Sequence, residues 1–125
     1  GSLVDCAKFE SLTWLMLSHT NISGNLFTLS SLVHLERLQL NHCPNVKGEI
    51  VSLSGLPALQ GLGLSGTAVT GELMHLATLT TLIGLALDKT NVTPASQNDI
   101  DTFRSITGCD IVKVSMIKRR SQRRY

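Results

Sequence analysis

The chain has 125 residues, of which 42% are hydrophobic and 16% are charged, and its formal net charge at pH 7 is +2. A chain of this length fits one domain, and this composition excludes an intrinsically disordered protein. No apolar run approaches the roughly 20 residues that a membrane-spanning helix needs.

The first eleven residues precede the regular part of the sequence. Gly1 and Ser2 are typical of residues left by cloning, and no charged-then-apolar leader follows them, so no signal peptide is indicated. Residues 3–11 match the second half of a repeat whose first half is missing. We therefore expect a partial N-terminal repeat, in a chain that starts inside a longer protein.

Residues 12–93 repeat a leucine pattern at a nearly fixed interval. The segment L-x-x-L-x-L opens at positions 12, 35, 59 and 82, so successive repeats are 23, 24 and 23 residues long. A fixed period of this size indicates stacked repeats. The second repeat has one extra residue near Cys43-Pro44-Asn45, and this insertion predicts a local bulge.

The full motif L-x-x-L-x-L-x-x-[T/C]-x-[I/V]-x-G-x-[L/I] resembles that of the leucine-rich repeat (LRR) family over residues 3–111. Its glycine is similar to that of the plant-type subclass and of T-x-V-T-G repeats in single-celled eukaryotes. The resemblance implies an α/β solenoid. Its right-handed superhelix would carry a parallel β-sheet on the concave face and short 3₁₀ or helical segments on the convex face. The usual Asn of the motif is replaced here by Thr20, Cys43, Thr67 and Thr90.

Local spacing predicts how each repeat folds. The leucines of L-x-x-L-x-L alternate with other residues, which is the period of a β-strand. The following leucines recur every third residue, which suits a 3₁₀ helix. Glycines at 24, 48 and 71 predict backbone bends. The outward strand positions are Trp14, Met16 and Ser18, then Arg37, Gln39 and Asn41, then Gly61, Gly63 and Ser65, and finally Gly84, Ala86 and Asp88.

Residues 94–117 break the repeat and predict a C-terminal cap. We expect a helix over 94–106, with Ser96 as its N-cap and Ile100 and Phe103 facing inward. The segment 106–111, from Ile106 through Cys109 to Ile111, copies L-x-x-L-x-L and predicts the last strand. A basic tail follows at 118–125 and holds five Lys or Arg residues and no acidic one. Residues 1–117, by contrast, hold six Lys or Arg residues and nine Asp or Glu residues.

The outward positions of the first two strands form the candidate partner-binding site: Trp14, Met16, Arg37, Gln39 and Asn41. Trp and Arg dominate the energetics of protein interfaces, and Arg37 can stack on the Trp14 ring. The small residues of the next two strands predict a flat trench where a partner backbone can approach. The alternative is that Trp14 is covered by a missing N-terminal coil or a neighbouring loop.

Several other patterns have a structural explanation. Gly61–Gly66 spells G-x-G-x-x-G, but its leucines are core leucines and no long helix follows, so no dinucleotide cofactor is expected. His19 and His42 should lie within ~5 Å on neighbouring strands, without further ligands for a metal. Cys6, Cys43 and Cys109 should point inward as free thiols, which favours a reducing compartment. No catalytic set converges, so we expect no enzyme.

The sequence therefore predicts a non-enzymatic module that binds a protein or peptide partner on the concave sheet. One alternative is a nucleic-acid-associated protein that uses the basic tail. Another is a structural fragment of a larger LRR receptor or scaffold. The apolar, uncapped N-terminal end also predicts a homodimer in which two chains meet there.

Overall fold

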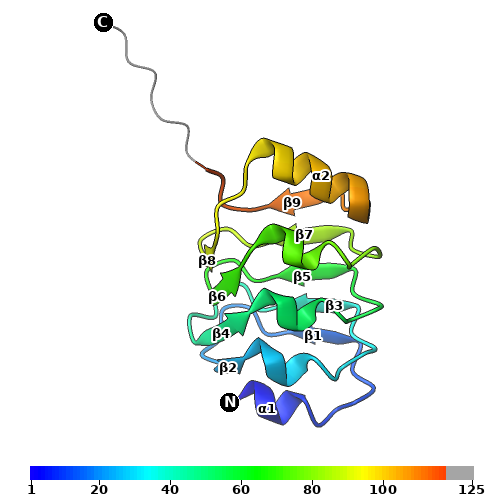
Figure 1. Cartoon of the computed structure of the whole chain (residues 1–125). Helices are drawn as coiled ribbons and strands as arrows, with labels where there is room; N and C mark the ends of the chain where they lie inside the picture. The colour runs from blue at the N-terminus through cyan, green and yellow to red at the C-terminus, as the bar shows by residue number, and fades with distance from the viewer. Residues whose placement is uncertain (118–125) are drawn as a thin grey trace, which may run out of the picture.

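The structure is a computed structural model that describes residues 1–117, and the basic tail predicted at 118–125 lies outside these residues. Successive coils stack from the N-terminus to the C-terminus (Figure 1). No helix in residues 1–117 is long and apolar enough to cross a membrane. The elements in chain order are α1 (Leu3–Cys6), β1 (Trp14–Met16), β2 (Gly24–Asn25), η1 (Leu26–Leu29), β3 (Arg37–Gln39), β4 (Val46–Glu49), η2 (Ile50–Leu53), β5 (Gly61–Gly63), β6 (Ala68–Gly71), η3 (Leu73–Leu76), β7 (Gly84–Ala86), β8 (Asn91–Val92), α2 (Gln97–Thr107) and β9 (Ile111–Lys113).

Two parallel sheets run the length of the stack. The concave sheet has the order β1-β3-β5-β7-β9, and a second sheet has the order β2-β4-β6-β8. The 3₁₀ helices η1, η2 and η3 lie one above another, between α1 and α2, and form the convex face (Figure 1). The concave sheet and the 3₁₀ helices were predicted from the leucine spacing, whereas the second sheet was not.

The leucines of each repeat form one continuous core. Leu35, Leu38 and Leu40 have no exposed surface, and their equivalents in the other repeats are also buried except Leu12 and Leu17 in the first coil, which are partly buried. Leu38 pairs in register with Leu15 on one side and Leu62 on the other. Because strand side chains alternate between faces, this register leaves the intervening residues on the concave surface.

The threonine position closes the turn after each concave strand. The Thr67 hydroxyl donates a hydrogen bond of 2.6 Å to the Leu64 carbonyl, and Thr20 and Thr90 make the same bond. Cys43 instead donates from its thiol to the Leu17 carbonyl of the preceding coil, at 3.1 Å. The extra residue of this repeat is absorbed in a turn, in which Val46 N donates to Cys43 O at 3.1 Å. The predicted bulge is therefore a hydrogen-bonded turn that leaves the strand pairing of β4 intact.

The predicted glycine bends are present, and Gly71 shows why glycine is needed. Its φ is +128°, a value that side chains disfavour, and a Cβ there would lie 2.8 Å from Cγ1 of Ile50 in the preceding coil. The position therefore requires glycine both for its backbone conformation and for the close approach of the coils.

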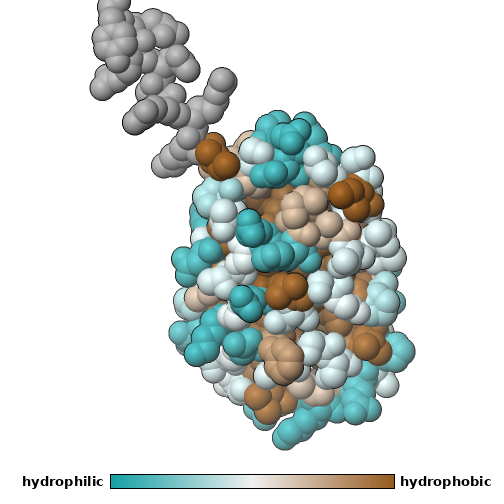
Figure 2. Space-filling model, in the orientation of Figure 1, coloured by the Kyte–Doolittle hydropathy of each residue, from teal (hydrophilic) through white to brown (hydrophobic). Residues whose placement is uncertain are grey.

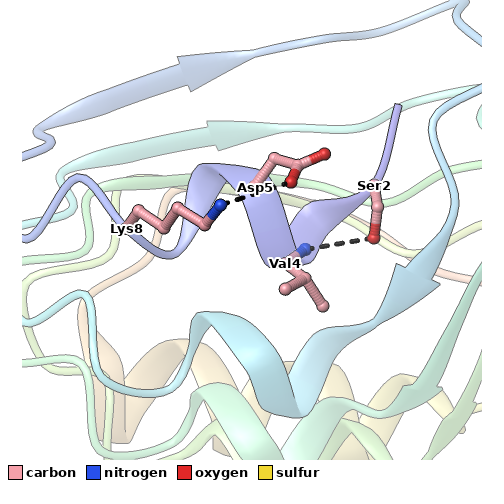
Figure 3. Close-up of polar contacts among 4 residues, drawn as sticks. All are labelled: Ser2, Val4, Asp5 and Lys8. Carbon is pink, nitrogen blue, oxygen red and sulfur yellow. Dashed lines mark hydrogen bonds and ion pairs between the residues drawn. The ribbon is translucent and has the colours of Figure 1, made fainter.

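Helix α1 occupies the place that the 3₁₀ helices take in later coils. Ser2 is its N-cap, with Val4 N donating to Ser2 Oγ at 3.2 Å, and Lys8 Nζ lies 3.8 Å from Asp5 Oδ1 (Figure 3). Leu3 is fully buried and donates from its backbone N to Ser23 O at 2.8 Å. Residues 3–6 thus pack on the first complete coil.

The cysteine prediction is right for two residues and wrong for one. All three are free, and Cys43 and Cys109 are buried, but Cys6 is only partly buried. Cys6 belongs to α1, which packs against η1 and β2 of the first complete coil, and its thiol is only partly covered by the core. The sequence pattern placed Cys6 correctly on the inward side but overestimated how fully it is covered.

Helix α2 closes the stack at the C-terminal end, as predicted. Ser96 Oγ accepts from Asp99 N at 3.1 Å and Ser96 N donates to Asp99 Oδ2 at 3.1 Å, which makes a reciprocal cap. Ile100 and Phe103 face the core, with 5% and 0% exposure.

The last strand has a different register from the prediction. The helix continues to Thr107 and ends at Gly108, which has a φ of 74°, so Ile106 is a helical residue and is exposed. Val112, rather than Cys109, pairs with Leu85, and Ile111 lies on the concave surface opposite Gly84. The inward positions of the last coil are therefore those of Cys109, Val112 and Val114.

Candidate functional site

The concave sheet brings Trp14 and Arg37 together at its N-terminal end. The two residues pair in register, and the Arg37 guanidinium carbon lies 5.0 Å from the centroid of the Trp14 ring. Trp14 is 56% exposed and Met16 is 54% exposed. A cation over an aromatic face is attracted by the ring, so Arg37 orients the indole without covering it. This end of the sheet therefore presents an apolar and cationic surface to solvent.

The other two predicted site residues form an amide network. Asn41 Nδ2 donates to Gln39 Oε1 at 2.9 Å, and Asn41 Oδ1 accepts from Ser65 N at 2.9 Å. The first bond joins two side chains of the same coil, the second ties Asn41 to the next coil, and both residues are partly buried. Both amides also lie over Gly63, where an added Cβ would collide with them. Gln39 and Asn41 are consequently held in place before any partner arrives.

The glycine trench is narrower than predicted. Gly63 is buried beneath the amides and takes no part in it. The open part is a hollow of about 200 Å³, lined by Arg37, Gln60, Gly61, Ile83 and Gly84. At Gly84 an added Cβ would meet only Ile111 Cβ, at 4.0 Å. A partner chain can therefore approach the backbone at Gly61 and Gly84.

Two residues of the concave surface were missed in the sequence. Ile111 is 60% exposed and pairs with Gly84, while Lys113 pairs with Ala86. The trench thus has Arg37 on one side and Ile111 on the other. The alternation of Val112 and Val114 as inward residues could have shown that Ile111 and Lys113 face outward. The predicted register, which starts the last strand at Ile106, placed Ile111 inward instead.

A polar edge follows the carboxyl ends of the concave strands. His19, His42 and Lys89 have φ values of 62°, 59° and 57°, and Gly66 occupies the same position with 70°. The two imidazoles lie within the expected distance, with centroids 4.7 Å apart, and their rings are stacked. His19, His42 and Lys89 line a second hollow of about 360 Å³ with Asp88, which accepts from Ser65 Oγ, and with Lys113. Within residues 1–117, no group of three or more His, Cys, Asp or Glu side chains is placed to hold a metal.

The two thiols with shifted pKa values, Cys6 and Cys109, belong to opposite ends of the stack. Burial raises the pKa of the Cys109 thiol above its ordinary value, and Asp110 adds to this effect. Burial also raises the pKa of the Cys6 thiol. The thiol of Cys109 donates to Ile111 O at 3.4 Å. The G-x-G-x-x-G segment forms β5 and a turn, and the next helix is the four-residue η3, so the strand-to-helix turn of a dinucleotide site is absent there.

Comparison with known proteins places this architecture. No protein-family model and no curated protein matches the chain. Solved structures of other proteins match it over most of its length. An internalin (inlF) from Listeria monocytogenes has a TM-score of 0.68 and 17% identity, with 92% of this chain and 33% of that one covered. The LRR ectodomain of the receptor kinase SOBIR1 from Arabidopsis thaliana has a TM-score of 0.71 and 22% identity, with 93% of this chain and 61% of that one covered.

The third structure is the plant peptide hormone receptor RGFR1 in complex with RGF2. Its TM-score is 0.65 and its identity is 17%, with 93% of this chain and 22% of that one covered. The chain therefore spans between 22% and 61% of the length of these three proteins. With its stacked parallel strands, its leucine core and these structural neighbours, the chain has the leucine-rich-repeat fold.

Proposed function

We propose that the chain is a non-enzymatic interaction module that binds a protein or peptide partner on its concave sheet. The observation that carries this proposal is the exposed Trp14–Arg37 pair beside the hollow at Gly61 and Gly84. RGFR1, which has the same fold, is solved in complex with RGF2 and provides a precedent for a bound ligand.

The site residues have distinct roles in this proposal. Trp14 and Met16 bury apolar area against the partner, and Arg37 donates hydrogen bonds from its guanidinium group. The glycines let a partner backbone lie close to the sheet. Because the amides of Gln39 and Asn41 are already bonded to each other, they lose little conformational entropy on binding.

A peptide-display selection against the wild-type chain tests this site. Peptides are selected for binding to any face of the protein, and the affinities of the selected peptides are then measured for two variants. We expect Trp14→Ala to weaken binding by about 30-fold, since interface Trp residues contribute about 2 kcal/mol or more. Gly84→Leu should block binding because its side chain fills the trench while the backbone there tolerates a Cβ.

The matched control lies outside the concave sheet. Val33→Ser changes an exposed apolar side chain there and should leave the affinity unchanged. If the selected peptides bind Gly84→Leu and Trp14→Ala as tightly as the wild type, the concave site is refuted.

Self-association at the N-terminal end is a second part of the proposal. Strand β1 pairs with β3 alone among the strands of residues 1–117, and Phe9 and Trp14 are 64% and 56% exposed at this end. An open strand edge beside apolar side chains favours pairing with a second copy. Sedimentation at several concentrations should show a dimer; a strict monomer near 13.5 kDa at high micromolar concentration would end this idea.

Nucleic-acid binding is a rival that rests on the basic tail at 118–125, which lies outside the described residues. Phosphate binding weakens steeply with salt, while apolar contacts do not. Binding to DNA or RNA that falls with salt and is lost on removing the tail would support this rival. Salt-independent binding of a peptide would support the concave site.

A further inference from the structure

A column of exposed apolar side chains runs along the convex face. The second residue of each short helix points outward, because the first residue of each is buried in the core. One such residue comes from α1, η1, η2 and η3 in turn, and brown and tan atoms lie one above another over α1, η1 and η2 (Figure 2). The column consists of Val4, Phe27, Val51 and Met74, which are 53%, 69%, 41% and 38% exposed.

A small acidic pocket lies at the C-terminal end of this column. It has a volume of about 130 Å³, with apolar walls from Met74, Pro94 and Ala95, and its lining also includes Glu72, His75 and Asp99. The Glu72 carboxylate lies 3.8 Å from His75 Nε2, and Asp99 Oδ2 accepts from Ser96 N at 3.1 Å. A pocket with apolar walls and acidic residues is complementary to the aliphatic stem and cationic head of a Lys or Arg side chain.

We propose that this convex column and its pocket form a second docking surface, which binds a basic amphipathic α-helix of a partner protein. The repeat distances support a helix. The coils are about 4.8 Å apart, so four coils span about 14 Å, and three turns of a helix span about 16 Å. A helix with one apolar residue per turn therefore matches the column, with a Lys or Arg at its end in the pocket.

The same distances disfavour an extended partner. In a β-strand, side chains on one face recur every ~6.7 Å. The fourth side chain on that face would lie about 20 Å from the first and would miss the fourth coil. A second copy that met this surface with its own convex column would match the spacing, but it would bring a second Glu72 and Asp99 against the first pair. Charge complementarity therefore selects a basic helix.

A synthetic helical peptide provides a direct test. The probe is about 15 residues long, with one leucine per turn and arginine residues along the flank and at the end, and its fluorescence anisotropy is measured with the wild-type chain. We expect the double variant Phe27→Ser, Val51→Ser to bind at least about tenfold more weakly. Glu72→Gln should weaken binding and reduce its salt dependence, because it removes a charge from the pocket.

Matched controls separate this surface from the concave site. Trp14→Ala should bind the helical peptide like the wild type, as should Val33→Ser, which changes an exposed apolar residue outside the column. The substituted side chains are all solvent-exposed, and unchanged thermal unfolding confirms that each variant is folded.

Three results would overturn the proposal. One is no binding of the helical peptide, or equal binding by the double variant. Another is equal binding of a peptide with the same composition but leucines at alternate positions, or with glutamate in place of arginine. The third is a dimer of the chain alone that the double variant abolishes, since the column would then bind a second copy. None of these outcomes bears on the concave site, which is tested with Trp14 and Gly84.

Discussion

Leu62 and Gln60 are two residues apart and differ in what they contact. Leu62 is 1% exposed in the middle of the core, while the partly exposed side chain of Gln60 lines the concave hollow. We expect Leu62→Ala to lower the free energy of unfolding by roughly 2–5 kcal/mol, because it leaves a cavity. Gln60→Ala should be nearly neutral. Equal shifts of the urea midpoint in the two variants would contradict the inward and outward assignment.

The reactivity of the three cysteine thiols tests how deeply each side chain is buried. Cys43 and Cys109 should react slowly with a thiol reagent in the native protein and Cys6 faster, since Cys6 alone is partly exposed. All three should react after denaturation. A native disulfide detected by mass spectrometry would refute this description.

The raised pKa of Cys109 also predicts a pH dependence of stability. Because the folded state favours the protonated thiol, its contribution is present below the ordinary pKa of 9.0 and is lost as pH rises above that value. We expect the free energy of unfolding to fall above about pH 9, and to fall less in Cys109→Ala. An identical fall in the variant would show that Cys109 does not contribute.

The short strands and 3₁₀ helices were predictable where the leucines followed a single regular spacing. Leucines at alternate positions specified β1, β3, β5 and β7, and leucines at every third position specified the 3₁₀ helices. The second sheet was missed because its strands are two to four residues long and are defined by pairing between coils rather than by alternation. The register of β9 was missed because Ile106 and Ile111 are apolar but exposed, so hydrophobicity alone favoured the wrong residues.

The register of β9 can be tested with a pair of neighbouring substitutions. Val112 packs against the core and Ile111 lies on the concave surface. We expect Val112→Ala to destabilise the protein by about 1 kcal/mol, because it removes buried methyl groups, and Ile111→Ala to have little effect. The measurement is chemical denaturation, and the reverse order would restore the register that starts at Ile106.

The whole molecule is a stack whose stability and surface both depend on neighbouring coils. No coil can bury its leucines alone, so the core is shared along the stack. The candidate site crosses coils in the same way, since Trp14 and Arg37 belong to successive repeats. The sequence predicted that these two side chains face outward, because the repeat register fixes which residues of each strand do so. It could not predict that the amides of Gln39 and Asn41 cover Gly63, because that depends on side-chain conformations.

The fluorescence of Trp14 tests binding to the concave sheet most directly. Trp14 is the single Trp of the chain and is 56% exposed, so the emission reports on the surroundings of this one residue. A peptide selected against the wild-type chain is titrated into the protein, and saturation is confirmed independently by calorimetry. We expect the emission to shift to shorter wavelength as the partner covers the indole. An unchanged spectrum at saturation would contradict the account, because the partner would then bind elsewhere.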